Sequence, residues 1–264
     1  MQQSVLNLDN FSKSQLIKAI DRADSEESLI GFIKCAWSIL EPDNQFTPGW
    51  HIEAICDHLE AITRGDIKRL LVNVPPGCMK SLTTNVFWPA WEWGPQYLPG
   101  NRYVCASYSQ DLTHRDNRKT MSLVKSEWYQ NLWPHLEIDR GQDSKTRFDT
   151  TRKGFKIATS IGGLGTGERG DRFIVDDPHN IKEGESEKVL RNTLHWWREV
   201  VPSRINSAIN SAILCIMQRV NEQDVSGYII SNELGEDNGY THLMLPMEFE
   251  PKRKCMIEVT NFED

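Results

Sequence analysis

The stretch LLVNVPPGCMKS, residues 70–81, decides the fold that this sequence predicts. Its apolar start predicts a buried strand, its two prolines and glycine a tight loop, and Lys80 the beginning of a helix. Backbone amides at such a loop and helix start bind anions, and the lysine adds charge to phosphates. Ser81 supplies the hydroxyl that phosphate loops offer to Mg²⁺. Val74 and Met79 stand where glycines are usual, so an ordinary strand–turn–helix remains the alternative for this stretch taken alone.

The composition is that of a globular protein. The chain has 264 residues, 39% hydrophobic and 25% charged, which suits one large α/β domain. It has no apolar run of about 18 residues and does not begin with a basic and then apolar segment, so we expect neither a membrane span nor a signal peptide. Its 6 cysteines form no C-x-x-C pair, which favours free thiols in a reducing compartment over disulfides or a zinc site.

The charge is unevenly distributed. A net charge of −7 argues against a protein that coats nucleic acid without specificity. Residues 102–156 nevertheless carry 11 Lys and Arg against 7 Asp and Glu, whereas residues 1–60 carry 4 against 10. The basic middle could make a localised phosphate contact, and a solvated mixed surface is the alternative.

Strand and helix patterns alternate along the chain. This alternation predicts a mostly parallel sheet with helices on both faces, and phosphate loops in such sheets lie at the carboxyl ends of strands. Residues 134–153 show no pattern, and we expect them to be irregular. The expected strands are 70–74, 102–107, 155–160, 172–175, 212–217 and 241–245, and the expected helices lie within 12–40 and at about 51–64, 80–94, 109–126, 184–200 and 222–234.

Two adjacent carboxylates, Asp176 and Asp177, directly follow the apolar strand at 172–175. Magnesium-nucleotide chemistry uses such a pair: the first carboxylate holds Mg²⁺, and the second orients and deprotonates the attacking water. An Asx-Pro turn made with Pro178 is the alternative. The G-x-G-x-x-G pattern at 165–170 precedes a strand rather than a helix, so it does not indicate a dinucleotide-binding fold.

Four motifs together resemble a known family. PPGCMKS, YVCASYSQDLTHRDNR, GTGERGDRFIVDDPHN and ILCIMQRVNEQDVSG follow one another in the order found in the ATPase (motor) domain of tailed-phage large terminases. The resemblance covers about residues 40–250, and the DDP-His and QRVNEQDVSG stretches carry most of its specificity. It implies a P-loop NTPase fold of the ASCE type and the use of ATP and Mg²⁺.

The resemblance also implies roles for individual residues. Asp177 stands where many members have a catalytic glutamate, and because it is shorter, Glu183 or Glu185 could act as the base instead. Arg118, on the predicted helix 109–126, would reach the nucleotide of a neighbouring subunit, unless it pairs with a nearby aspartate. The remaining assignments are phosphate binding by Lys80, Mg²⁺ binding by Ser81 and Asp176, γ-phosphate sensing by Gln218, and nucleotide contacts from Pro76, Gly77, Cys78, Met79, Leu82 and, on the adenine side, Trp50.

The organisation implied by the resemblance has three parts. An N-terminal helical segment (1–42) precedes the ATPase core (43–246), and a linker (247–264) follows. The family's nuclease domain is expected to be absent, since 18 residues after Pro246 cannot supply its acidic cluster.

The implied function is a motor that moves double-stranded DNA into a viral procapsid in the host cytoplasm. Its partners would be a portal protein, a small terminase subunit and copies of itself in a ring, with no membrane involved. A helicase-like ATPase outside packaging and a nucleotide-binding module that does not hydrolyse ATP remain the alternatives.

Overall fold

A computed structural model describes residues 12–163, 167–183, 186–235 and 239–248. A single sheet of eight strands, in the order β3-β4-β5-β2-β6-β7-β1-β8, forms its centre. The strands are β1 (Arg69–Asn73), β2 (Arg102–Ser107), β3 (Ile138–Asp143), β4 (Arg147–Thr150), β5 (Phe155–Ser160), β6 (Arg172–Asp176), β7 (Ala212–Met217) and β8 (Thr241–Met244).

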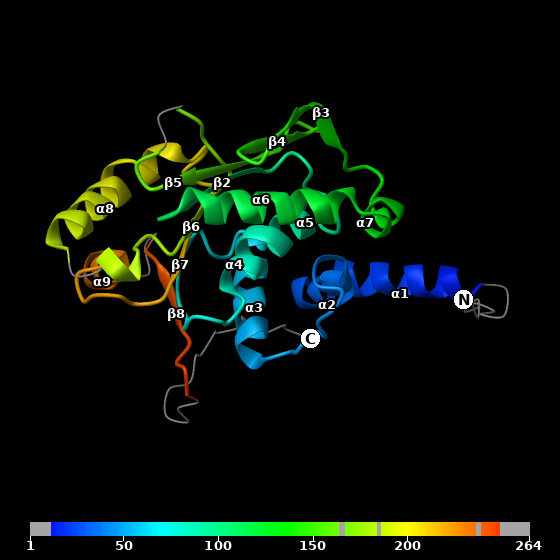
Figure 1. The fold of residues 1–264 in the computed structure, drawn as a ribbon, viewed down its shortest axis with the longest axis horizontal. Coiled ribbons are helices and arrows are strands. Elements are labelled where there is room, and N and C mark those ends of the chain that lie inside the picture. The colour runs from blue at the N-terminus through cyan, green and yellow to red at the C-terminus, as the bar shows by residue number, and fades with distance from the viewer. Residues whose placement is uncertain (1–11, 164–166, 184–185, 236–238, 249–264) are drawn as a thin grey trace.

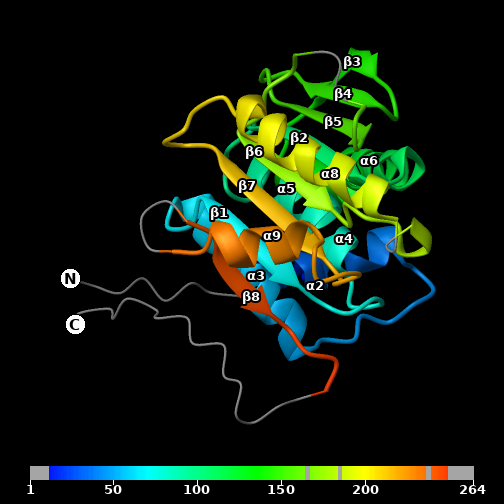
Figure 2. The ribbon, with the colours of Figure 1, turned by 90° about the vertical axis from the view of Figure 1, so that its left-hand side faces the viewer.

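Helices cover both faces of this sheet. Figure 2 shows α8 and α9 in front of the strands and the other helices behind them. The helical elements are α1 (Lys13–Glu27), α2 (Leu29–Leu40), α3 (Trp50–Arg64), α4 (Lys80–Leu82), the π-helical η2 (Thr83–Phe87), α5 (Trp88–Trp93), α6 (Gln110–Lys125), α7 (Glu127–Leu132), the 3₁₀ turns η3 (Ile181–Glu183) and η4 (Val201–Arg204), α8 (Glu187–Glu199) and α9 (Val225–Asn232).

The central strands are apolar on both sides because both sides are covered. Successive side chains of a strand point to opposite faces. Leu70 and Val72 of β1 therefore pack with α2, α3, α5 and α6, whereas Leu71 packs with α8 and α9. Side chains of β2, β6 and β7 divide between the two clusters in the same way. Two-sided burial of this kind is typical of parallel sheets, and it explains the continuous apolar runs in the sequence.

The N-terminal helical pattern forms two helices. Ser12 caps α1 and makes a capping box with Gln15, and Ser28 ends α1 and caps α2. α1 projects beyond the body of the molecule, as Figure 1 shows. α2 has four fully buried side chains, and these belong to the core cluster that α3 and α5 also line. In the described part of the chain, no helix has the length and apolar character that a membrane span requires.

The expectation of an irregular segment at 134–153 is wrong. This segment forms β3 and β4, which pair antiparallel with each other, and β4 pairs antiparallel with β5. Five of the six residues of β3 are exposed, and the register of the β3–β4 pair is irregular. An exposed edge strand needs no apolar side chains, so its sequence carries no alternating pattern.

The strand order brings three loops together at one edge. β7 lies between β1 and β6, and all three strands run parallel. The hydrogen-bond ladder continues beyond the strands, since the amides of Val74 and Asp177 donate to the carbonyls of Met217 (3.2 Å) and Ile216 (2.9 Å). The loops after β1, β6 and β7 therefore leave the sheet side by side.

Candidate functional site

The loop between β1 and α4 has the backbone conformation of a tight turn. Gly77 has a φ of 80° and Met79 a φ of 56°, so two residues of the loop adopt the left-handed conformation. This conformation is ordinary for glycine and uncommon for methionine. Pro76 and Gly77 are exposed, whereas Cys78, Met79 and Leu82 are half-buried and pack against the core.

Lys80 points from this loop toward the carboxylate loop. Its ammonium group lies 2.6 Å from Oδ2 of Asp177, and the lysine is only 8% exposed. The other carboxylate oxygen of Asp177, Oδ1, accepts a hydrogen bond from the backbone amide of Gln218 (3.2 Å). One side chain therefore connects the ends of β1, β6 and β7. Its backbone has a φ of 45°, a strained conformation of the kind that clusters at functional sites.

Asp176 is the buried member of the carboxylate pair. Burial, followed by the nearby charge of Asp177, raises the pKa of Asp176 to about 7, and the hydroxyl of Ser81 acts in the opposite direction. Its Oδ2 accepts a hydrogen bond from Nδ2 of Asn85 (3.0 Å). Its Oδ1 is buried and has no hydrogen-bond partner in the described protein.

These residues fit a magnesium ion. Mg²⁺ prefers oxygen ligands and is held by one or two protein groups together with water and substrate phosphates. A buried carboxylate oxygen without a partner, next to a serine hydroxyl, offers that donor set. A cation would also supply the positive charge that the buried Asp176 lacks. Among the described residues there is no cluster of three or more His, Cys, Asp or Glu side chains suited to a metal.

Trp50 is the first residue of α3 and is 49% exposed. α3 ends at Arg64, is capped by Gly65 and leads to β1 through a short connection, so we place its start toward the carboxyl edge of the sheet. The indole ring packs edge-to-face with His51. Its contact with a nucleotide remains a prediction.

The two arginines of α6 differ in their partners. The guanidinium group of Arg115 lies 2.9 Å from a carboxylate oxygen of Asp116. Arg118 is exposed and makes no ion pair within the described part of the chain. Glu185, considered above as a base, lies outside the described residues, and of Glu183 only the backbone is described.

A set of polar residues behind the site was not predicted from the sequence. Asn73, the last residue of β1, accepts hydrogen bonds at Oδ1 from the Ser226 hydroxyl and from Nε2 of His242, both at 2.8 Å. Nε2 of His179 accepts one from the backbone amide of Val225 (3.0 Å). Asn73 can be recognised in the sequence as a polar residue at the end of an apolar strand. No local sequence pattern shows that Ser226 and His242 contact it, because they are distant in the chain.

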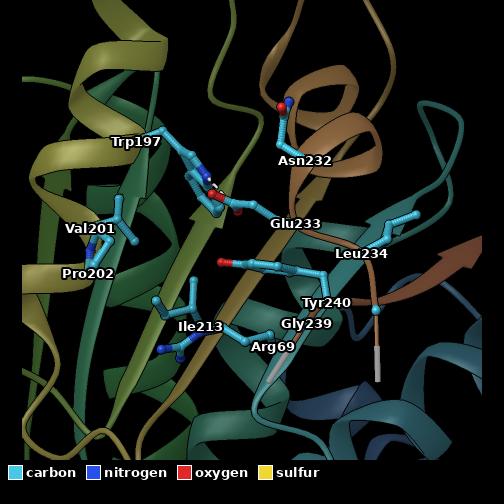
Figure 3. Close-up of a pocket in the computed structure, with 11 residues that line it drawn as sticks. Arg69, Trp197, Val201, Pro202, Ile213, Asn232, Glu233, Leu234, Gly239 and Tyr240 are labelled. Carbon is cyan, nitrogen blue, oxygen red and sulfur yellow. Dashed lines mark hydrogen bonds between the residues drawn. The ribbon is translucent and has the colours of Figure 1, made fainter. Parts of the chain in front are cut away.

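The cavity drawn in Figure 3 lies elsewhere. It has a volume of about 360 Å³, and the Arg69, Ile213 and Tyr240 side chains line it beside Trp197 of α8. Because β1 and β7 begin near this cavity, it lies at the amino edge of the sheet, opposite Lys80. None of the predicted site residues lines it. The cluster around Lys80 is therefore the candidate site.

The fold places the strand that leads into the Lys80 loop, the strand that ends in two carboxylates and a third strand between them in one mostly parallel sheet. The chain is similar to the HK97 bacteriophage large terminase, with a TM-score of 0.50 and 14% identity over 86% of this chain. It spans 46% of the length of that protein. The similarity shows a shared fold, so the predicted fold class and the resemblance are confirmed at that level.

Two further solved structures match with lower scores. A variant of the Thermus phage P74-26 large terminase ATPase domain has a TM-score of 0.47 at 14% identity, over 76% of this chain and 82% of that one. The N-terminal domain of the DNA-packaging ATPase from bacteriophage phi29 has a TM-score of 0.43 at 13% identity, over 72% and 96%. No protein-family model and no curated protein matches the sequence.

Proposed function

We propose that this chain is an ATP-hydrolysing motor domain that powers movement of double-stranded DNA into a viral procapsid. The observation that carries the proposal is the convergence of Lys80, Asp176, Asp177 and the Gln218 amide at the ends of three adjacent parallel strands. The fold shared with the HK97 bacteriophage large terminase supports it. ATP and Mg²⁺ are the ligands that such a cluster suits.

Each residue of the cluster has one task in this proposal. The backbone N–H groups of Gly77, Cys78 and Met79 and the ammonium group of Lys80 bind the phosphates, and Pro76, which has no N–H, contributes contact only. Ser81 and Asp176 hold Mg²⁺, which neutralises charge on the phosphates when it is bound. Asp177 orients the attacking water and accepts its proton.

The ion pair between Lys80 and Asp177 gives this scheme a starting state. The ammonium group of Lys80 lies 2.6 Å from Asp177, and a bound phosphate would compete with this carboxylate for the same positive charge. Phosphate binding would therefore draw the ammonium group away from Asp177. The carboxylate would then be released at Oδ2 while Oδ1 stays with the amide of Gln218. Nucleotide binding would thus free Asp177 to act as the base. Because Asp177 stays bonded to the amide of Gln218, its change of partner would also reach the residue that follows β7.

The proposed partners follow from the same function. The motor would act as a ring of copies of this chain, docked at a portal protein in the host cytoplasm and supplied with DNA by a small terminase subunit. The chain would contact double-stranded DNA, and a helicase-like ATPase would favour single strands.

ATP turnover by the purified chain tests the proposal. We expect Mg²⁺-dependent hydrolysis that double-stranded DNA stimulates more than single-stranded DNA does. Lys80→Ala should lower turnover by at least about 10²-fold, because the charge on the transferred phosphoryl group loses its lysine. The variant should remain folded, because Asp177 keeps its hydrogen bond from the Gln218 amide. The Asp177 side chain is also 20% exposed, so water can solvate its charge when Lys80 is absent. A folded variant with turnover within about threefold of the wild type would refute the phosphate loop.

A further inference from the structure

A π-helical turn separates the phosphate loop from α5. The helical run that begins at Lys80 widens at Thr83–Phe87, designated η2, and returns to α-helical geometry at Trp88. π-helical turns are rare and occur frequently at functional sites. The middle residue of this turn is Asn85, whose side chain is 1% exposed.

Asn85 contacts the candidate magnesium ligand directly. Its Nδ2 donates to Oδ2 of Asp176 at 3.0 Å. In the ionised form that a bound cation requires, the carboxylate of Asp176 can only accept hydrogen bonds, so the NH₂ end of the Asn85 amide must face it. The opposite amide atom, Oδ1 of Asn85, is buried and has no partner in the described protein. The amide therefore leaves Oδ1 without a hydrogen bond while its NH₂ group holds Asp176, and an unsatisfied buried acceptor is destabilising.

The backbone of Asn85 is held from outside its own helix. The hydroxyl of Thr120 on α6 lies 3.2 Å from the carbonyl oxygen of Asn85 and 2.9 Å from that of Asp116 within α6, so its one proton is shared between the two acceptors. A π turn shifts the backbone hydrogen-bond register by one residue, so it also determines which side chain faces β6. η2 and Thr120 together thus present the Asn85 amide to Asp176.

The hydrogen bond from Asn85 occupies one carboxylate oxygen of Asp176 and leaves the other available for a cation. Oδ2 of Asp176 is occupied by Asn85, while Oδ1 is buried and unpartnered in the described protein. A neutral amide orients the carboxylate without cancelling its negative charge. A lysine or arginine in its place would compete with a cation for that charge.

We propose that Asn85 is a positioning residue that holds Asp176 with one oxygen directed to nucleotide-bound Mg²⁺. This inference rests on the proposed function, because it concerns the same site. Groups that orient metal ligands typically contribute about 10- to 100-fold to metal affinity or activity. Asn85 acts through Asp176 and does not itself touch the substrate.

Binding of the fluorescent nucleotide mant-ADP, measured with EDTA and across a Mg²⁺ titration, tests the role of Asn85. For Asn85→Leu we expect the Mg²⁺ concentration at half-saturation to rise by about 10- to 100-fold. The affinity measured in EDTA should stay within about twofold of the wild type, because the phosphate loop is unchanged. A general loss of structure would instead weaken both.

Thr84→Val is the matched control. Thr84 is buried in the same π turn, but its hydroxyl bonds the carbonyl of Lys80 inside the helix (2.8 Å). Its Mg²⁺ dependence should equal that of the wild type. If Asn85→Leu does not fold, Asn85→Ser removes the amide with less change in volume, and the same shift is expected.

The outcomes separate the two proposals. A wild type that binds mant-ADP more tightly with Mg²⁺, together with folded Asn85 variants of unchanged Mg²⁺ dependence, overturns the role of Asn85 alone. A wild type that binds no nucleotide overturns the proposed function and this inference together.

Discussion

At the scale of single residues, the site distinguishes two neighbouring carboxylates by their surroundings. Asp176 is buried, accepts from an amide and has its pKa raised to about 7. Asp177 retains 20% of its side-chain surface and pairs with Lys80. A carboxylate that is buried and short of positive charge suits a cation, and one that is partly open to solvent can reach a water molecule.

The variants Asp176→Asn and Asp177→Asn should therefore fail differently. We expect Asp176→Asn to weaken the Mg²⁺-dependent part of nucleotide binding. Asp177→Asn should bind Mg-ATP at least as tightly as the wild type, because Lys80 no longer has to leave a carboxylate. It should hydrolyse ATP about 10²- to 10⁴-fold more slowly, since an amide cannot accept the proton. Nucleotide titrations and single-turnover rates measure the two effects, and equal binding defects would contradict the division of roles.

At the scale of elements, the buried strands were the most predictable part of the fold. The predicted bounds of β2, β5 and β7 agree with the structure. β2 and β7 contain continuous apolar runs, and β5 is apolar apart from Lys156 and Thr159 before its last residue. The ends of the buried strands also carry the predicted site, so the nearness of Lys80 and Asp177 follows from topology. β3 does not show in the sequence because an exposed edge strand carries no apolar pattern, and β4 does not because it has four residues with Phe148 as its one large apolar side chain.

Other features depend on contacts between distant elements. The π turn η2 was not predicted, because its register depends on Asp176 and on Thr120 of α6. The ion pair between Lys80 and Asp177 does not follow from the sequence either. The motifs predict that Lys80 binds phosphate and that Asp177 acts on water, but they do not show that the two side chains pair when no ligand is bound.

A buried ionic network joins α5 to β2 and β6. Glu92 is fully buried and accepts hydrogen bonds from Arg172 (2.8 Å), Asn101 (3.0 Å) and Thr63 (2.8 Å), and from the hydroxyl of Tyr103. Removing one partner of a buried pair leaves a charge uncompensated, whereas replacing both partners with apolar groups is often neutral. The network therefore fixes how α5 lies on the sheet.

We expect Arg172→Met to lower the free energy of unfolding by about 3–5 kcal/mol, as measured in urea. The double variant with Glu92→Met should recover part of this loss. Arg191→Met is the control, because Arg191 and Glu187 lie 3.9 Å apart with 75% and 83% of their side chains exposed. Its effect should stay below about 1 kcal/mol. An Arg172 variant as stable as this control would show that Glu92 is compensated by other groups.

At the scale of the whole molecule, several buried or half-buried histidines make the stability depend on pH. Burial lowers the pKa of His58, His114 and His242 below the usual 6.5. At these histidines the unfolded chain binds more protons than the folded one, so their contribution to the free energy of unfolding falls as pH drops below about 6.5. The folded state tolerates these histidines in their neutral form, and protonating them while they are buried destabilises it. Asp176, whose pKa is raised to about 7, contributes in the opposite direction.

His58→Met should flatten this dependence. His58 is 3% exposed and bonds only the carbonyl of Ala54 through Nδ1 in the described structure. Between about pH 7 and pH 5 the variant should lose less unfolding free energy than the wild type, by an amount on the order of 1 kcal/mol. His195→Gln, at an exposed position of α8, is the matched control. Urea denaturation at several pH values measures the difference, and parallel curves for all three proteins would refute it.

The assembly is tested at Arg118. Among the described residues, none of the ion pairs and hydrogen bonds found at Lys80 and the carboxylate pair involves an arginine. Arg118 is exposed and has no ion pair in the described part of the chain, and it lies on α6, which crosses the front of the molecule in Figure 1. Arg115, three residues earlier, is already paired with Asp116. An arginine supplied by a neighbouring subunit can accelerate phosphoryl transfer by roughly 10³- to 10⁵-fold. If Arg118 is that group, an isolated chain turns over slowly and specific activity rises with protein concentration.

Mixed assemblies distinguish this role from a local one. Arg118→Ala chains have an intact phosphate loop, and Lys80→Ala chains have an intact arginine, so each alone should be nearly inactive. An equimolar mixture should regain activity wherever a Lys80 variant supplies Arg118 to the nucleotide of an Arg118 variant. Arg115→Ala serves as the control and should retain activity, because that side chain is engaged with Asp116 of its own helix. If activity per chain stays constant from dilute to concentrated solution and the mixture remains inactive, Arg118 does not act across subunits.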